Sequence, residues 1–96
     1  MKIDFTKNKG ELKISLDGRL DTITAPELEA FLTQNSEGIS SLVFDCEKLA
    51  YVSSAGLRVL LTAHKRMKGA MKLVGVNEIV MEVMEMTGFS EIWVIE

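Results

Sequence analysis

Residues 53–61 read Ser53-Ser54-Ala55-Gly56-Leu57-Arg58-Val59-Leu60-Leu61, and they follow the apolar run Ser41-Leu42-Val43-Phe44-Asp45 after a short connection. This order predicts a strand that leads into a helix. Ser53 or Ser54 stands where a hydroxyl side chain caps the first turn of a helix. A helix N-terminus favours anions because its unpaired N–H groups and the positive end of its dipole point the same way. The serines are therefore either simple caps or a place where the fold would tolerate a phosphate and display it to a partner.

Two stretches near the N-terminus, residues 3–5 and 12–16, alternate apolar and polar side chains as half-buried strands do. Residues 6–10 between them have turn chemistry, so we predict an antiparallel hairpin. Residues 17–21 then predict a polar loop, with Gly18 where the chain bends.

A first helix is predicted from Thr24 onward. Thr24 stands as its N-cap, Glu27 occupies the capping-box position, and Pro26 is tolerated within the first turn. The helix is expected to end around residues 35–38. Its buried stripe is predicted to be Ala25, Leu28, Phe31 and Leu32.

Residues 42–44 and 71–76 are short, largely apolar runs separated by a helical segment. Strands that are apolar on both faces belong in the middle of a sheet covered by helices, which implies parallel neighbours and right-handed crossovers. The intervening helix is expected to stop at Gly69. Its apolar face is predicted to hold Leu57, Leu60, Leu61, His64 and Met67.

Asn77 can cap a third helix that ends at Thr87-Gly88, and residues 89–95 predict a last short strand. The predicted order is β-β-α-β-α-β-α-β. We therefore expect residues 1–96 to form a single α/β domain with helices packed on a mixed β-sheet.

The composition is that of a globular protein, since 47% of the 96 residues are hydrophobic and 26% are charged. A net charge of -3 gives no overall attraction to nucleic acid or to anionic lipid, and we expect neither as a partner. The N-terminus resembles no signal peptide and no run reaches membrane-spanning length, so we predict a cytoplasmic protein without membrane insertion. Cys46, the single cysteine, is expected to be a small buried residue of a protein in a reducing compartment.

No catalytic residue is predicted. His64 is the only histidine, and its place on an apolar helix face indicates a packed side chain. Ten residues of helix, about 15 Å of rise, separate it from Ser54, which makes a nucleophile and base pair geometrically poor. Ser54 also lacks the Gly-x-Ser-x-Gly elbow, because Val52 occupies the first glycine position. A small hydrolase that uses Ser54 is thus the disfavoured alternative.

Three carboxylates, Asp17, Asp21 and Asp45, lie at predicted strand ends and could in principle gather a divalent cation. We interpret them as surface residues and predict no metal site. Phosphate-loop and dinucleotide-binding glycine motifs are absent from the sequence, so no cofactor is expected.

Five methionines, Met67, Met71, Met81, Met84 and Met86, are concentrated in the second half of the chain. They either fill the core or contribute to an adaptable contact surface. Arg58 is either a solvated charge or a counter-charge to a phosphorylated Ser54.

The segment from Leu49 to Leu61 resembles the signature of the STAS family, the anti-sigma-factor antagonist domains. Further resemblances, in the order of the family, are Gly18-x-Leu20-Asp21-x-x-Thr24-Ala25, residues 42–45 and Met86-Thr87-Gly88-Phe89. Together they cover nearly the whole chain. The resemblance implies a non-enzymatic binding module with the STAS fold.

In that family the serine two residues before the glycine is phosphorylated, which corresponds here to Ser54. Ser53 stands where many antagonists carry aspartate and is the second choice. The unphosphorylated protein would bind an anti-sigma factor of the histidine-kinase-like ATPase class and so release a sigma factor. That kinase would phosphorylate Ser54 and end the association, and a PP2C-type phosphatase would restore it. The expected partner-binding residues are Asp21, Thr24, Ser53, Ser54, Gly56, Leu57 and Arg58.

Two further implications follow from the resemblance. Many members have an additional C-terminal helix, whereas the last expected element here is the strand before Glu96. The same domain also serves as an accessory subunit of lipid or anion transport systems, a scaffold role without phosphorylation, and this is the alternative function.

Overall fold

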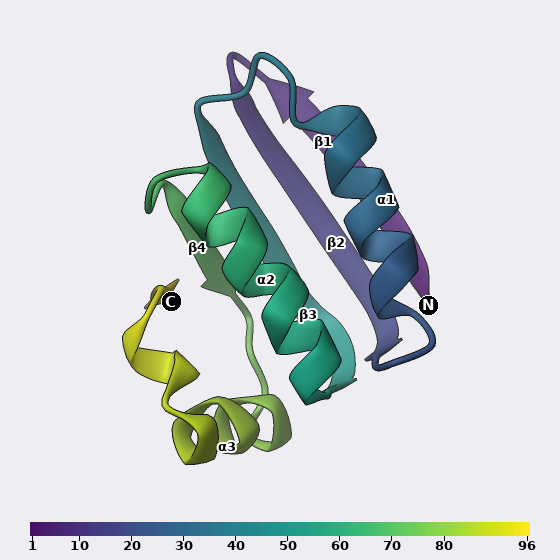
Figure 1. The fold of residues 1–96 in the computed structure, drawn as a ribbon, viewed down its shortest axis with the longest axis vertical. Helices are drawn as coiled ribbons and strands as arrows, with labels where there is room; N and C mark the ends of the chain where they lie inside the picture. The colour runs from purple at the N-terminus through teal and green to yellow at the C-terminus, as the bar shows by residue number, and fades with distance from the viewer.

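A computed structural model describes all of residues 1–96, and its chain starts with a long hairpin (Figure 1). Strand β1 (Lys2–Asn8) pairs antiparallel with β2 (Glu11–Leu20). The hairpin turn is only Lys9-Gly10, with φ of 51° and 84°, because two left-handed residues match the twist of the paired strands. Both strands are therefore longer than predicted, and the expected five-residue turn at 6–10 is wrong.

The predicted loop at 17–21 is also wrong up to Leu20, because β2 continues through it. Its pairing with β3 (Ser41–Val52) is irregular between Ser15 and Asp17 and again between Gly18 and Arg19. Gly18 has a φ of 113°, which bends the strand without ending it. The bulges let the strand return a fully buried side chain, Leu20, to the core.

Strand β3 (Ser41–Val52) is the longest strand and pairs parallel with β2 on one side and β4 (Met71–Val74) on the other. Strand β5 (Val94–Ile95) pairs parallel with β4, which gives the strand order β1-β2-β3-β4-β5. The prediction of parallel central strands in a mixed sheet is confirmed. The prediction of a short connection after Asp45 is wrong, because β3 continues to Val52. The adjacent exposed residues Glu47 and Lys48 interrupt the alternation of buried and exposed side chains, which hides the second half of this strand in the sequence.

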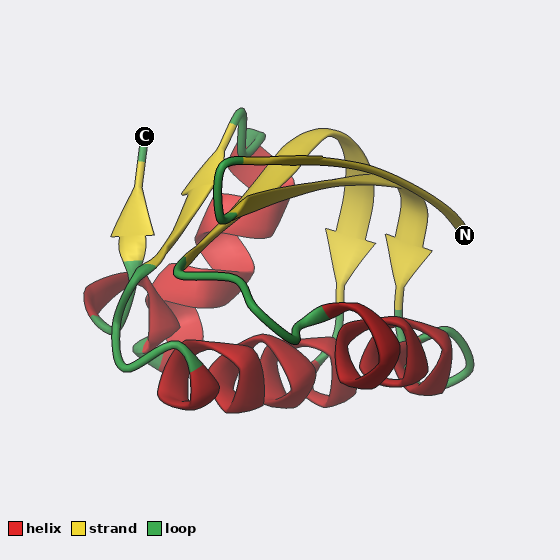
Figure 2. Ribbon diagram, turned by 90° about the horizontal axis from the view of Figure 1, so that it is seen from above, coloured by secondary structure: helices red, strands yellow, loops and turns green.

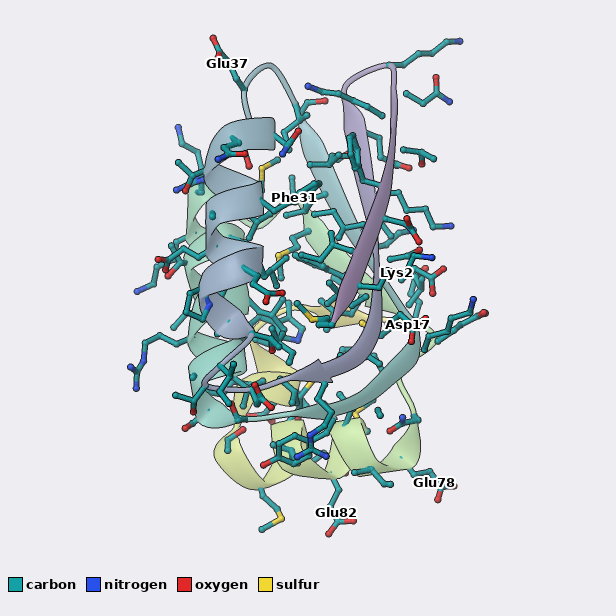
Figure 3. All side chains as sticks on the ribbon, turned by 90° about the vertical axis from the view of Figure 1, so that its right-hand side faces the viewer. Lys2, Asp17, Phe31, Glu37, Glu78 and Glu82 are labelled. Atoms are coloured by element: carbon teal, nitrogen blue, oxygen red, sulfur yellow. The ribbon has the colours of Figure 1, made fainter.

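Helices α1 (Ala25–Asn35) and α2 (Ser54–Arg66) cover one face of the sheet, and no helix covers the other face (Figures 2 and 3). Between the helices and the sheet lies the core, which includes the fully buried Leu12, Ile14, Leu16 and Phe44. In α1 the predicted stripe is confirmed at Ala25, Leu28 and Leu32, whereas Phe31 lies at its edge against Phe5, with ring centroids 5.1 Å apart.

The buried stripe of α2 differs from the prediction. It is centred on Leu57, Leu60 and Ala63, while Leu61, His64 and Met67 are only half-buried at its margin. The stripe shifts because α2 packs against α1 as well as the sheet, which also buries Val59.

Helix α3 (Glu78–Thr87) closes one end of the sheet. The predicted cap is confirmed, since the Asn77 Oδ1 accepts the Val80 N–H at 2.8 Å. The predicted helix end at Thr87-Gly88 is also confirmed, with Gly88 at a φ of 82°. The last strand is not 89–95: a short 3₁₀ turn, η1 (Phe89–Glu91), precedes β5, and Trp93 between them is 4% exposed. None of the three helices combines the length and apolarity needed to cross a membrane.

Candidate functional site

The candidate site lies at the N-terminus of α2, where the chain leaves β3. Ser53 is the N-cap, and its Oγ accepts the Gly56 N–H at 3.4 Å. The Ser53 N–H itself donates to the Leu20 carbonyl at 2.9 Å, which joins the start of α2 to the end of β2. Ser54 is the first residue of the helix, and its side chain is exposed. The two serines thus have different surroundings, one used by the cap and one facing solvent.

Gly56 brings α2 against the end of β2. A Cβ at this position would lie 2.7 Å from the Leu20 Cγ, 2.8 Å from the Leu20 carbonyl oxygen and 3.0 Å from the Val52 Cγ2. Gly56 and Leu57, both expected on the partner-binding surface, are buried. They therefore position the turn that displays Ser54, and the Leu57 side chain is not available for direct contact.

The loop before α1 lies at the same end of the molecule (Figure 1). The Asp21 Oδ1 accepts the N–H groups of Ile23 at 3.0 Å and Thr24 at 3.1 Å. These bonds, the Thr24 bond first, lower the pKa of the Asp21 carboxyl below its usual value, with a smaller contribution from the Arg19 charge. The turn is therefore held most firmly when Asp21 is ionised.

Thr24 is not the side-chain cap that the sequence predicts. Its hydroxyl donates to the Arg19 carbonyl at 2.7 Å and accepts the Asp21 N–H at 2.9 Å, and it makes no capping bond to α1. The backbone of Thr24 is already helical, with φ of -91° and ψ of -19°, so the hydroxyl points back toward the loop. Asp21 and Thr24 are thus a mutually hydrogen-bonded pair that shapes the surface beside α2.

Two residues that the sequence did not single out complete this end. The Arg19 guanidinium carbon lies 4.5 Å from the centroid of the Tyr51 ring, and its Nε lies 3.8 Å from the Asp21 Oδ2. Arg19 and Tyr51 are opposite one another in the β2 and β3 register. A cation over an aromatic face is attracted by the ring quadrupole, which holds the guanidinium in place. Only the strand register brings them together, so no local pattern could have revealed the pair.

Arg58 is exposed one turn after Ser54 on α2. Residues four apart on a helix are neighbours on its surface, so Arg58 and Ser54 lie on the same face of α2. The first turn of α2 therefore combines the positive charge of Arg58 with the positive end of the helix dipole.

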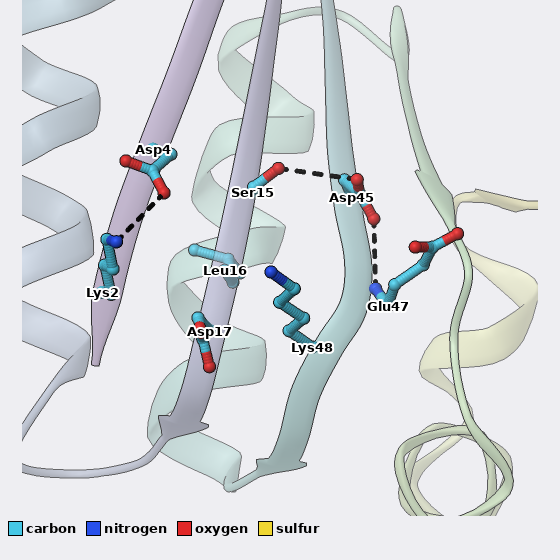
Figure 4. Close-up of a pocket in the computed structure, with 8 residues that line it drawn as sticks. All are labelled: Lys2, Asp4, Ser15, Leu16, Asp17, Asp45, Glu47 and Lys48. Carbon is cyan, nitrogen blue, oxygen red and sulfur yellow. Dashed lines mark hydrogen bonds and ion pairs between the residues drawn. The ribbon is translucent and has the colours of Figure 1, made fainter.

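Asp17 and Asp45 lie elsewhere, on the open face of the sheet, and not at strand ends as predicted. Both line a polar pocket shown in Figure 4, where the Ser15 Oγ donates to the Asp45 Oδ2 at 3.5 Å. Asp21 does not join them, because it belongs to the loop before α1. The structure holds no group of three acidic, histidine or cysteine side chains placed to bind a metal ion.

His64 lies toward the opposite end of α2 from Ser54, with its ring centroid 6.3 Å from that of Trp93. Cys46 is fully buried as predicted, and burial raises the pKa of its thiol to about 12. The methionines fit both interpretations of the sequence, core filling and a contact surface. Met71 and Met84 belong to the core, whereas Met86 is 79% exposed.

Comparison with known proteins places this geometry in a family. The STAS domain model matches residues 2–96. The chain is 37% identical to BtrV of Bordetella bronchiseptica, named as an anti-sigma factor antagonist, over 97% of this chain and 84% of that protein.

Solved structures share the fold. An anti-sigma factor antagonist structure from Thermotoga maritima superposes with a TM-score of 0.86 at 16% identity, over 97% of this chain and 84% of the other. SpoIIAA of Bacillus in its phosphorylated form superposes with a TM-score of 0.74 at 14% identity, over 99% of this chain and 91% of the other. The family model and the identity to BtrV together show that this chain belongs to the STAS domain family.

Proposed function

We propose that this protein is an anti-sigma factor antagonist switched by phosphorylation of Ser54. In its unphosphorylated form it binds an anti-sigma factor of the histidine-kinase-like ATPase class and so releases a sigma factor. The observation that carries the proposal is the exposed Ser54 on the first turn of α2, beside a cap that uses Ser53 instead. The name of BtrV and the existence of a phosphorylated SpoIIAA support the role.

The surroundings of the two serines favour Ser54 as the acceptor. A phosphate on Ser53 would replace the hydroxyl that accepts the Gly56 N–H, in a half-buried position beside Leu20. A phosphate on Ser54 meets no such obstacle, because this side chain faces solvent. Ser53 is therefore the second choice.

The effect of the phosphate follows from electrostatics. It adds about -1.5 to -2 charges at neutral pH. The helix N-terminus and the neighbouring Arg58 stabilise that charge, so the fold is kept while the surface changes. A partner that fits a neutral hydroxyl must then desolvate an anion, and the ATP phosphates and catalytic carboxylate in its active site repel it. Binding ends without refolding, and a PP2C-type phosphatase restores it.

The protein has no catalytic task in this scheme. The kinase brings ATP, Mg²⁺ and the catalytic carboxylate, while residues 1–96 act as one domain that presents the hydroxyl. Asp21, Thr24 and Arg58 contact the partner around it, and Gly56 and Leu57 hold the turn in position. Because sigma factors act inside the cell, we propose a cytoplasmic location.

The test is phosphorylation by the anti-sigma factor kinase encoded nearest to this gene. The purified protein is incubated with that kinase and ATP, and the product is mapped by tandem mass spectrometry. We expect one phosphate on Ser54, none on Ser54→Ala, and an unchanged amount on the matched variant Ser90→Ala, which alters another serine of the chain. Phosphate on another residue, or undiminished labelling of Ser54→Ala, overturns the site. Absence of both labelling and binding favours the transport scaffold instead.

A further inference from the structure

Helix α3 exposes apolar side chains that the core does not use. Ile79 is 61% exposed and Met86 is 79% exposed, and Val83 between them is half-buried. The spacing of these three residues, i, i+4 and i+7, puts them in one stripe along the helix. Val80 and Met84 on the adjoining face are fully buried and anchor the helix. Ile79 and Met86 therefore contribute little to the packing of the domain, while Val83 lies at the edge of the core.

An acidic row runs beside this stripe. Glu78, Glu82 and Glu85 are exposed, and α3 contains no lysine or arginine. None of the three ion pairs of the structure involves them. Figure 3 shows Glu78 and Glu82 pointing away from the body of the protein. We call these three residues, with Ile79, Val83 and Met86, the α3 surface.

The α3 surface lies at the end of the molecule that displays Ser54. Asn77, the cap of α3, donates its side-chain N–H to the Leu49 carbonyl at 2.9 Å, on the strand that leads to Ser53. Figure 1 shows α3 beside the N-terminus of α2. The basic residues at the other end of α2, Lys65 and Arg66, lie far from it. The unpaired acidic row thus lies at the end of the molecule where the proposed partner arrives.

We propose that the α3 surface is a second part of the docking site, which binds a basic and apolar surface of the same protein that binds at Ser54. It has this role only if the proposed function holds. The unpaired carboxylates complement lysine or arginine side chains, and the stripe supplies apolar area. An anionic membrane would be repelled by the same carboxylates.

The two parts of the surface act on different rates. Exposed charges at the rim of an interface mainly steer association, so the acidic row raises the association rate at low salt. Apolar contacts mainly slow dissociation, so the stripe lowers the dissociation rate. A phosphate on Ser54 acts at a separate place and does not require α3 to move.

The experiment measures association and dissociation rates by biolayer interferometry with the immobilised anti-sigma factor kinase used above. Glu82→Lys tests the acidic row, and Glu37→Lys is its matched control, the same charge reversal at the opposite end of the molecule (Figure 3). Ile79→Ser tests the stripe, and Val94→Ser is the control at a residue that is 53% exposed on β5. Thermal melting checks that all four variants keep the stability of the wild type.

We expect Glu82→Lys to lower the association rate by about tenfold at low ionic strength, with the difference shrinking at high salt. Ile79→Ser should raise the dissociation rate by about fivefold. Both controls should stay within about twofold of the wild type. If Ser54→Asp abolishes binding while Glu82→Lys and Ile79→Ser leave it unchanged, the docking role of the α3 surface is overturned and the proposed function is kept. No binding by the wild type overturns both. Self-association that Glu82→Lys abolishes would identify a second copy as the occupant and also overturn it.

Discussion

The close approach of α2 to β2 makes Gly56→Ala a stringent test of how the site is built. The new Cβ would lie 2.7 Å from the Leu20 Cγ and 2.8 Å from the Leu20 carbonyl oxygen. Real carbon atoms do not approach this closely, so α2 must move away from the end of β2. That displacement also stretches the bond from the Ser53 N–H to the same carbonyl, now 2.9 Å long.

Opposing effects decide the magnitude. Overpacking costs about 1–3 kcal/mol, and weakening the Ser53 hydrogen bond costs about 1 kcal/mol more. Alanine is favoured over glycine within a helix by about 1 kcal/mol, which offsets part of this loss. We expect a net destabilisation of about 2 kcal/mol, which lowers the Tm of a domain of this size by about 8–16 °C.

The assay is urea and thermal unfolding followed by the fluorescence of Trp93, the only tryptophan, and by circular dichroism. The matched control is Ser54→Ala, an exposed change in the same helical turn, which should alter the free energy of unfolding by less than about 0.5 kcal/mol. Gly56→Ala should also slow the proposed phosphorylation of Ser54, because it displaces the turn. Wild-type or higher stability of Gly56→Ala would refute the close contact and the positioning role assigned to it.

Three other predictions concern single side chains. Because the pKa of Asp21 is lowered in the folded state, the ionised carboxylate stabilises the fold above its unfolded pKa, and this stabilisation is lost as the pH falls through the folded pKa. Asp21→Ala should therefore reduce the urea midpoint at pH 7 more than at pH 3. Equal losses at the two pH values would contradict this role of Asp21. Asn77→Ala removes the cap of α3 and the hydrogen bond to the Leu49 carbonyl, so it should lower the free energy of unfolding in urea by about 1–2 kcal/mol. An unchanged urea midpoint would show that neither bond contributes to stability. Cys46, fully buried with a pKa of about 12, should react with a thiol reagent only as fast as the protein opens; rapid labelling under native conditions would contradict its burial.

Features set by a few neighbouring residues could be predicted from the sequence. A cap by Ser53 or Ser54 and a cap by Asn77 could be predicted, because each depends on one side chain and a nearby backbone N–H. The structure has these caps at Ser53 and Asn77. The glycine end of α3 at Gly88 is equally local. The element order followed from the spacing of these signals and of the apolar runs.

The lengths and partners of the strands could not be predicted in the same way. The long β3 contains two adjacent exposed residues, Glu47 and Lys48, and only its pairing with β2 makes it continuous. Thr24 has a good capping sequence, yet its hydroxyl binds the Arg19 carbonyl, which the tertiary structure brings close. The last strand is shorter than predicted, because the chain before it places Trp93 in the core.

The same distinction holds for the candidate site. The sequence by itself determined that a hydroxyl stands at the start of α2, because helix capping is decided within one turn. Only the tertiary structure decided that Ser53 is used by the cap while Ser54 faces solvent, and that Arg19 lies over Tyr51. It also brought the acidic face of α3 to that end of the molecule. The bond from the Ser53 N–H to the Leu20 carbonyl and the contact of Arg19 with Tyr51 join residues far apart in the chain. Parallel strand pairing and helix packing depend on the whole fold and not on any one segment.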